Sequence, residues 1–138
     1  IIGDWQYEPA AIEWLPTGNL MMTDDIGGRT AILEADVEGK ASPRELVKGR
    51  RQIRGVSFDA TGNTVAFVAT SMNKPTELFI ANRDGSNERQ LTTFNDELNK
   101  DVVWSDAERF TYKSVGNLEI EGWLMKPYGY EAGRSTRW

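Results

Sequence analysis

Two residue types that carry much of enzyme chemistry, cysteine and histidine, are absent from this chain of 138 residues. Without cysteine the chain has no disulfide, no thiolate metal ligand and no cysteine nucleophile. Without histidine it lacks the imidazole on which serine hydrolases, most zinc sites and most general bases at neutral pH depend. The sequence therefore predicts that the chain by itself is not a self-sufficient enzyme.

Long apolar runs and an excess of positive charge are also missing. The longest apolar stretch near the middle is Val65 to Ala69, far short of the roughly 18 residues of a membrane-spanning helix. The chain has 16 basic and 21 acidic side chains and a net charge of −5, whereas binding to nucleic-acid phosphates favours the opposite sign. We therefore expect no membrane and no nucleic-acid partner. The absence of cysteine and of Asn-x-Ser/Thr sequences favours a cytoplasmic location, with the periplasm as the alternative.

Three stretches of the sequence resemble one another. They cover residues 12–22, 56–67 and, more weakly, 102–112. In each, a short apolar segment ends in an aromatic residue (Trp14, Phe58 or Trp104), and a polar turn leads to a second apolar segment. The aromatic residues are 44 and then 46 positions apart. The Thr-Gly-Asn turns of the first two copies suit tight hairpins, because glycine and asparagine tolerate positive φ.

The first two copies extend into four short strands each. Residues 31–36 parallel residues 77–82, and residues 44–47 parallel residues 88–92. A repeat of about 40–45 residues with four strands is typical of a β-propeller blade. Prolines and glycines interrupt every window that could form an amphipathic helix. The sequence therefore predicts an all-β fold in which residues 1–100 form two four-stranded blades, a fragment of a larger propeller.

The third copy departs from the blade pattern after Tyr112. A Gly116-Asn117 turn separates residues 110–114 from residues 119–126, and both segments alternate apolar and polar side chains. We expect residues 101–131 to contain a junction, with a boundary between Asn99 and Asp106, and one antiparallel hairpin. Residues 132–138 are expected to be a tail of the kind that a vector adds, and the chain is expected to be part of a longer protein.

Two segments carry a resemblance to a known family. They are residues 77–86 with residues 89–92 (ELFIANRDGS and RQLT), and residues 108–114 followed by residues 120–127 (ERFTYKS and IEGWLMKP). Over about residues 12–131 the chain resembles the prolyl oligopeptidase family of serine peptidases, nearest to its acylaminoacyl-peptidase and dipeptidyl-peptidase-like branches. The first segment is also similar to Tol-system propellers. In the peptidase family the second segment forms the first hairpin of an α/β-hydrolase domain, directly after the last blade. Val115 departs from the acidic residue usual before the turn glycine.

This resemblance implies that a catalytic α/β-hydrolase domain, missing from this chain, follows the hairpin. Its nucleophile elbow has the sequence Gly-x-Ser-x-Gly, and the nearest match here is Gly55 to Asp59, in which Asp59 replaces the last glycine. Ser57 lies in a predicted strand and has no histidine to accept its proton. We therefore predict that Ser57 is an ordinary strand residue. No residue is assigned a catalytic, cofactor-binding or metal-binding role, and no cofactor is expected.

Two acidic segments admit a functional and a structural interpretation. Residues 82–88 (NRDGSNE) faintly resemble a calcium loop, but Asp-Gly between strands is a common hairpin signal, which favours a turn. Asp24 and Asp25 are candidates for paired carboxylates, and a polar hairpin loop between strands explains them equally well.

The basic and aromatic residues also have both a functional and a structural interpretation. Lys48, Arg50, Arg51 and Arg54 form a basic patch that suits an anionic substrate terminus, although a solvated loop between blades is the more common role of such a run. The tryptophans divide into a group expected in the core and a group in the opening segment. Trp14, Trp104 and Trp123 are predicted to pack in the core, and Trp5 and Tyr7 to pack on a missing neighbour.

Two functions remain in competition at this point. The first is a non-catalytic propeller fragment of a prolyl oligopeptidase-family serine peptidase that gates and helps bind peptide substrates and is inactive alone. The second is a Tol-type propeller scaffold for protein–protein contacts; a propeller that binds carbohydrate or polyphenol is a weaker third. The expected partners are a peptide substrate, the missing blades and hydrolase domain, or other copies of the fragment. The apolar residues expected to face such neighbours are Val65, Phe67, Val68, Phe79 and Ile80.

Overall fold

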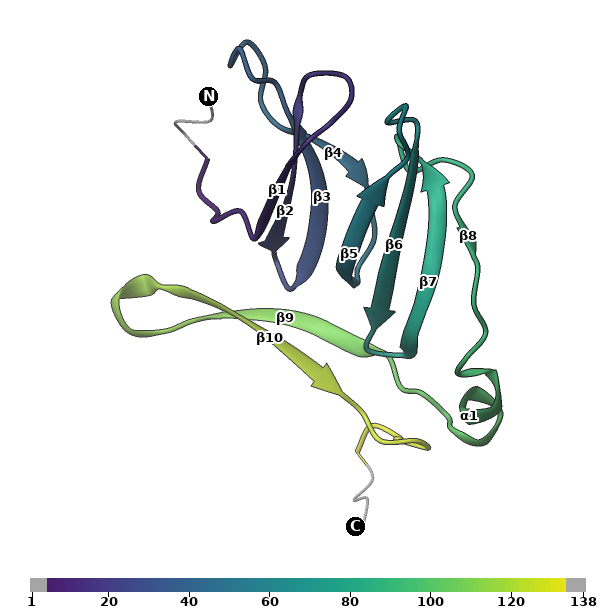
Figure 1. The fold of residues 1–138 in the computed structure, drawn as a ribbon. Coiled ribbons are helices and arrows are strands. Elements are labelled where there is room, and N and C mark those ends of the chain that lie inside the picture. The colour runs from purple at the N-terminus through teal and green to yellow at the C-terminus, as the bar shows by residue number, and fades with distance from the viewer. Residues whose placement is uncertain (1–4, 134–138) are drawn as a thin grey trace.

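The computed structural model describes residues 5–133, and most of its regular structure is β-strand. Strands β1 (Ala11–Trp14), β2 (Leu20–Ile26), β3 (Arg29–Ala35) and β4 (Arg44–Val47) form one antiparallel sheet in chain order. Strands β5 (Gln52–Phe58), β6 (Thr64–Ser71), β7 (Lys74–Asn82) and β8 (Arg89–Gln90) form a second sheet in the same order. Strands β9 (Ala107–Lys113) and β10 (Glu119–Met125) form a hairpin that runs past one end of both sheets (Figure 1). The prediction of two four-stranded units followed by a hairpin is confirmed.

The all-β prediction is wrong for one short segment. Residues Asp96–Asp101 form helix α1, with acidic side chains in its first turn and Lys100 in its last, an arrangement that suits the helix dipole. Residues 102–104, expected as the first strand of a third repeat, are not in a strand. The β-propensity of Val102, Val103 and Trp104 is not realised there because no neighbouring strand pairs with them. No described helix has the length and apolar character that crossing a membrane requires.

The hairpin has the predicted pairing. Tyr112 lies opposite Ile120, and the register continues without a shift from the Lys113–Glu119 pair to the Ala107–Met125 pair. A single 3-10 turn, η1 (Val115–Asn117), closes it, with positive φ at Gly116 and Asn117. Of the tail expected at residues 132–138, residues 134–138 lie outside the described part of the chain.

The internal repeat is confirmed by the strand pairing. Trp14 pairs with Leu20 in the first sheet, and Phe58 pairs with Val65 in the second. Leu20 and Val65 in turn pair with Ala35 and Ala81, which gives the offset of 46 predicted for the third strands. The stretch between the paired residues Trp14 and Leu20 is one residue shorter than that between Phe58 and Val65, so the offset changes from 44 at the aromatic residues to 45 in the second strands.

The main hydrophobic core lies between the two sheets. Its buried members come from both sheets and are Leu15, Met21, Ile32, Leu46, Val47, Ile53, Val65, Phe67, Ala69 and Ala81. Val65, Phe67 and Phe79, expected to face neighbours outside the chain, instead face the first sheet. Val68 and Ile80 alternate with them on the opposite face of the second sheet and are half-buried.

A second, smaller core covers the other face of the first sheet. It contains Met22, Ala31, Leu33 and Ala35, and Trp5 from the opening segment packs against it. The expectation that Trp5 needs a missing neighbour is therefore wrong, because Trp5 finds its packing surface on its own chain. Tyr7 contacts the Trp5 ring edge-to-face at 5.5 Å between ring centroids and is 44% exposed.

Candidate binding cleft

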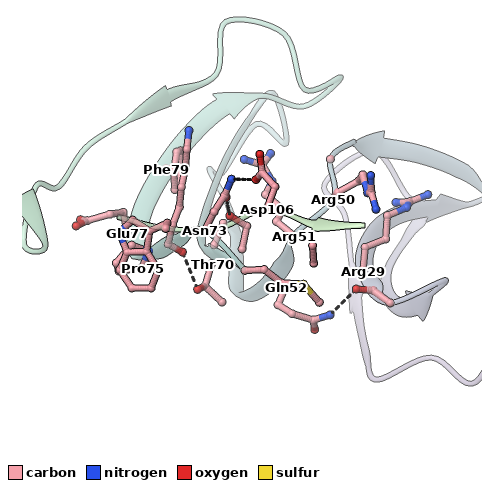
Figure 2. Close-up of a pocket in the computed structure, with 18 of the residues that line it drawn as sticks. Arg29, Arg50, Arg51, Gln52, Thr70, Asn73, Pro75, Glu77, Phe79 and Asp106 are labelled. Atoms are coloured by element: carbon pink, nitrogen blue, oxygen red, sulfur yellow. Dashed lines mark hydrogen bonds between the residues drawn. The ribbon is translucent and has the colours of Figure 1, made fainter. Parts of the chain in front are cut away.

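A cleft of about 1260 Å³ opens at the end of the two sheets that lies toward the hairpin (Figures 1 and 2). Its lining comes from six separate segments of the sequence. They are the β2–β3 turn, the β4–β5 connection, the β6–β7 turn with the start of β7, the β8 region with Glu88 and Gln90, the α1–β9 region, and Trp123 of β10. Concave sites of this kind form where separate elements converge, and they are the first place to look for a ligand.

One wall of the cleft is organised by Arg51. Its guanidinium donates from Nη1 to Oε1 of Glu88 at 2.7 Å and from Nη2 to the Lys48 carbonyl at 3.2 Å. The same group lies 5.0 Å from the ring centroid of Phe67 and 5.5 Å from that of Phe79. Both Nη groups of Arg51 are thus committed: they bond to other residues of the chain, and its guanidinium covers the rings of Phe67 and Phe79 at the edge of the main core.

The other three residues of the predicted basic patch divide between two places. Lys48 and Arg50 line the cleft and are exposed, whereas Arg54 is exposed on β5 and is not part of the lining. Lys74, from the β6–β7 turn, adds a third exposed cation to the lining. The structure therefore brings together only part of the patch that the sequence indicated, and adds a residue that was not expected.

The opposite wall is a polar network around the β6–β7 turn. Asn73 donates through Nδ2 to Oδ1 of Asp106 and accepts from the Ser71 hydroxyl at 2.9 Å. The Thr70 hydroxyl donates to the Lys74 carbonyl at 3.1 Å. Figure 2 shows Asn73 and Asp106 meeting in the middle of the cleft. The pair ties the β6–β7 turn to the segment that leads into β9.

Glu77 is a buried carboxylate on this wall, 6% exposed. It accepts hydrogen bonds from the Thr92 hydroxyl, from the Asn95 backbone N–H at 2.8 Å and from Asn95 Nδ2 at 3.0 Å. The pKa of Glu77 is lowered, first by the Thr92 hydroxyl and then, against the effect of burial, by the bonds from Asn95 and Phe94. Glu77 therefore fixes the polypeptide that leads from β8 to α1, and it is held as a carboxylate.

Two tryptophans complete the lining. Trp104 is 40% exposed and donates from Nε1 to Oδ1 of Asn99 at 3.0 Å. Trp123 is half-buried against the β2–β3 turn, where a Cβ on Gly28 would lie 2.3 Å from its Cζ2. The predictions that Trp14 and Trp104 belong to the core are wrong: Trp14, at the end of the first-sheet edge strand β1, is 71% exposed.

The remaining sequence candidates lie outside the cleft. Ser57 is in β5, as predicted, and is exposed next to a bulge that includes Gly55. Asp59 accepts bonds from the Thr64 and Asn63 backbone N–H groups and from the Thr61 hydroxyl. These bonds lower the pKa of Asp59 and close the β5–β6 turn. The position of the missing elbow glycine is thus occupied by a turn-forming carboxylate.

Asp24 and Asp25 do not form a carboxylate pair in a loop. Both lie in β2. Asp24 is fully buried and accepts a bond from Trp5 Nε1 at 2.6 Å through Oδ2, while its Oδ1 has no hydrogen-bond partner among residues 5–133. Burial raises the pKa of Asp24, in part opposed by the Trp5 bond. Asp25 accepts from the Thr30 hydroxyl at 2.8 Å. The turn itself is Gly27-Gly28, and both glycines have the positive φ that a two-residue hairpin turn requires.

Residues 82–88 form a turn whose side chains bond one another. Asp84 Oδ1 accepts from the Ser86 backbone N–H at 3.0 Å and from its hydroxyl at 2.6 Å. Asn82 Nδ2 donates to the same hydroxyl at 2.9 Å, and Gly85 donates its N–H to the Asn82 carbonyl at 2.8 Å. In residues 5–133, no three or more acidic side chains are grouped so that they could hold a metal ion.

Several cleft residues could not be identified from the sequence. Asn73, Asp106 and Gln52 are polar side chains in a turn, a linker and a strand start, and nothing in their local patterns marks them. One signal was available for Glu77, because it is a single carboxylate in an otherwise apolar part of its strand. A buried carboxylate needs several hydrogen-bond donors. The donors to Glu77 are Thr92 and Asn95, so the carboxylate holds the loop between β8 and α1 in place.

The geometry and the fold together define the class of protein: two antiparallel four-stranded sheets, a shared core and an end-on hairpin match part of a propeller-containing peptidase. The Pyrococcus horikoshii acylaminoacyl peptidase superposes over 91% of this chain with a TM-score of 0.72 and 28% identity, and 19% of that chain is covered. The dipeptidyl peptidase 4 of Porphyromonas gingivalis matches over 93% of this chain and 19% of its own, with a TM-score of 0.66 and 17% identity, and so shows the fold alone.

A sequence relative agrees with the structural ones. The uncharacterized peptidase YuxL of Bacillus subtilis (strain 168) is 31% identical over 111 residues, which are 79% of this chain and 16% of the relative. No family model matches the chain. Over most of its length the chain is thus homologous to peptidases of the prolyl oligopeptidase family. It spans less than a fifth of the length of each relative.

Proposed function

We propose that this chain is the non-catalytic propeller-and-hairpin segment of a prolyl oligopeptidase-family peptidase, and that its cleft receives and filters peptide substrates. The observation that carries the proposal is the place of the cleft. Its lining comes from both sheets and from Trp123 of the hairpin, and the hairpin runs past this end of the sheets (Figure 1).

The size and chemistry of the cleft suit an extended peptide. Its volume of about 1260 Å³ exceeds the roughly 300–1,000 Å³ of small-molecule pockets. Its lining combines apolar surface from Phe79 and the two tryptophans with amide groups from Gln52 and Gln90. Peptides present both apolar side chains and backbone hydrogen-bonding groups, so a mixed lining of this type matches them.

The direction of the chain supports a gating role. The polypeptide leaves β10 at the same end of the sheets as the cleft (Figure 1). A catalytic domain attached after the hairpin would therefore face the cleft, and a substrate would pass the cleft walls on its way in. A serine nucleophile and its base would be supplied by that domain, because this chain contains no histidine.

Peptide binding to the isolated chain tests the proposal. A hexapeptide without tryptophan is titrated while tryptophan fluorescence is recorded. We expect a saturable change, and we expect Trp104→Phe to remove most of it, because Trp104 lines the cleft. Trp14→Phe is the matched control, since Trp14 is exposed on β1 and is not part of the lining.

Two outcomes would overturn the proposal. One is the absence of any saturable signal with hexapeptides of differing sequence at concentrations well above those expected in a cell. The other is a signal that Trp14→Phe removes and Trp104→Phe leaves intact, which would put the peptide on the opposite side of the first sheet from the cleft lining.

A further inference from the structure

We propose that the cleft selects peptides that carry a carboxylate, foremost the free C-terminal carboxylate, and that Lys48, Arg50 and Lys74 bind it. This inference rests on the proposed function, since it concerns which peptides the same cleft accepts. It is carried by how the charged residues of the cleft are paired and by their exposure.

The five cations of the lining fall into two groups. Arg29 donates to both carboxylate oxygens of Glu45, at 2.5 and 3.1 Å, and Arg51 is paired with Glu88. Lys48, Arg50 and Lys74 are exposed, and none of them has a carboxylate within ion-pair distance in the described part of the chain. Figure 2 shows Arg29 and Arg50 on one side of the cleft and Glu77 on the other, with Arg51 between them.

The acidic residues of the lining are mostly engaged. Glu77 is satisfied by Thr92 and Asn95, Glu88 by Arg51, and Asp106 by Asn73. In residues 5–133 only Asp96, on α1 at the far wall, lines the cleft without such a bond. Among the described residues, the three unpaired cations share the lining with three carboxylates that have no ion-pair partner: Glu77, which is buried, Asp106, which bonds to Asn73, and Asp96.

The ion pairs Arg29–Glu45 and Arg51–Glu88 cancel, so the cleft is close to neutral in a chain whose net charge is −5, and its three unpaired cations are exposed. Cations grouped along a concave surface attract an anion more strongly than the same cations on a convex one, because the low-dielectric walls focus the field. A peptide carboxylate is the anion that a peptide-binding cleft meets most often. Arg50 offers it a planar pair of N–H donors, and the two lysines offer point charges.

The size of the expected preference for a free-acid peptide follows from the exposure of Lys48, Arg50 and Lys74. Exposed ion pairs are individually weak, so we expect two or three of them to favour a free-acid peptide over its amide by about tenfold in Kd. The preference should shrink as salt rises, because exposed charges are screened beyond about 10 Å at 0.1 M ionic strength.

The test uses the 138-residue chain and three hexapeptides of otherwise identical sequence. The first has a free C-terminus, the second a C-terminal amide, and the third an amide with aspartate as its last residue. We expect the free acid to bind about tenfold more tightly than the simple amide. Tight binding of the third peptide would assign the preference to a carboxylate in general, and weak binding would assign it to the terminal carboxylate.

Variants identify the residues responsible. Arg50→Gln is expected to reduce the preference for the free acid and the combined Lys48→Gln, Arg50→Gln and Lys74→Gln variant to abolish it. The matched control is Arg54→Gln, which removes an exposed arginine from the same part of the chain but outside the cleft. Binding of the simple amide should change little in any of them.

Equal affinity for all three peptides would overturn this inference and leave the proposed function standing, because the cleft would still bind peptides. A preference that Arg54→Gln removes, and the triple variant does not, would also overturn it. If no peptide binds at all, the failure lies with the proposed function.

Discussion

Arg51 bonds to both sheets, through its side chain to the second and through its backbone to the first. Its guanidinium is shared between Glu88, the Lys48 carbonyl and the rings of Phe67 and Phe79. Its backbone carbonyl accepts from the Thr30 N–H of the first sheet at 3.0 Å. A residue that belongs to a basic run in the sequence is therefore a structural residue, and its charge is not available to a ligand.

Replacing Arg51 should destabilise the fold. Arg51→Met keeps most of the aliphatic length but leaves Glu88 without its partner and the two rings without their cation. We expect the free energy of unfolding to fall by about 2 kcal/mol, measured by urea denaturation. Arg54→Met is the control and should change it by less than about 0.5 kcal/mol, because Arg54 is exposed. Equal effects of the two substitutions would contradict this role of Arg51.

Glu34 makes a second polar link between the sheets. It is 6% exposed and accepts from Arg83 of the second sheet's β7–β8 turn, from Arg44 Nη2 at 2.8 Å and from Asn19 Nδ2 at 3.0 Å. Chiefly through the Arg83 bond, these donors lower the pKa of Glu34 to about 2, against the opposing effect of burial.

The shift predicts a pH dependence. A carboxylate whose pKa is lower in the folded than in the unfolded chain stabilises the fold above its unfolded pKa, and the stabilisation is lost as pH falls toward the folded pKa. For a fall from 4.5 to about 2 the contribution reaches about 3 kcal/mol. We expect the stability difference between the native chain and Glu34→Gln to be constant above pH 5 and to shrink steadily down to pH 2.

Chemical denaturation at a series of pH values measures this difference. Glu38→Gln is the matched control, since the Glu38 side chain is 61% exposed and pairs only with exposed Lys40. A Glu34→Gln difference that does not change between pH 5 and pH 2 would show that the Arg83 and Arg44 bonds do not hold the carboxylate as described.

At the scale of elements, the β9–β10 hairpin packs against the β2–β3 turn through Trp123. Trp123 occupies the space that a side chain at Gly28 would need, whereas the neighbouring Gly27 faces open space. Both glycines have positive φ, so both positions are strained by any other residue. The two positions differ only in their contact with Trp123.

This difference makes a matched pair of variants. Gly27→Ala should cost about 1 kcal/mol through the backbone alone. Gly28→Ala should cost more, because it also displaces Trp123, and it alone should shift the tryptophan emission spectrum toward that of an exposed indole. If the two variants have the same stability and the same emission, the hairpin does not pack on the turn.

The elements that the sequence predicted correctly are those with a local signal. The hairpin follows from its alternation and its Gly116-Asn117 turn, and the two repeats follow from matching turns and aromatic residues. Residues 102–104 were misassigned because Val102 and Val103 favour a strand that needs a partner, and partnering is not a local property. For Asp24 the sequence left a carboxylate pair and a hairpin loop open, and neither describes its buried place in β2, because the packing of Trp5 against the first sheet cannot be seen in the sequence.

At the scale of the whole molecule, the two sheets share one core, and the cleft exists only when they are joined. Phe67, fully buried and stacked on Phe79 at 5.8 Å between ring centroids, is the largest side chain in that core. Its contacts on both sheets predict a single cooperative unfolding transition, and Phe67→Ala should lower the free energy of unfolding by about 3–5 kcal/mol. Separate transitions for the two sheets would contradict a shared core.

The cleft itself was beyond prediction from the sequence. Its lining comes from six segments. Only their relative placement by the two sheets and the hairpin brings Asn73 to Asp106, or Lys74 into the same cavity as Lys48. The sequence offered the basic run either as an anion-binding patch or, more commonly for such a run, as a solvated loop, and two of its residues, Lys48 and Arg50, line the cleft. It did not separate the uncommitted Arg50 from the committed Arg51, because that distinction depends on Glu88, which is 37 residues further along the chain.

The central claim is that peptides bind in the cleft at the hairpin end of the two sheets. Hydrogen–deuterium exchange of the chain with and without a saturating free-acid hexapeptide tests it directly. The account predicts slower exchange in residues 48–52, 70–75 and 104–107, which line the cleft. Exchange in the turns at the other end of the sheets, residues 15–19 and 59–63, should be unchanged. Protection of those turns, or of the outer face of the second sheet, with no change in the cleft segments would contradict the account.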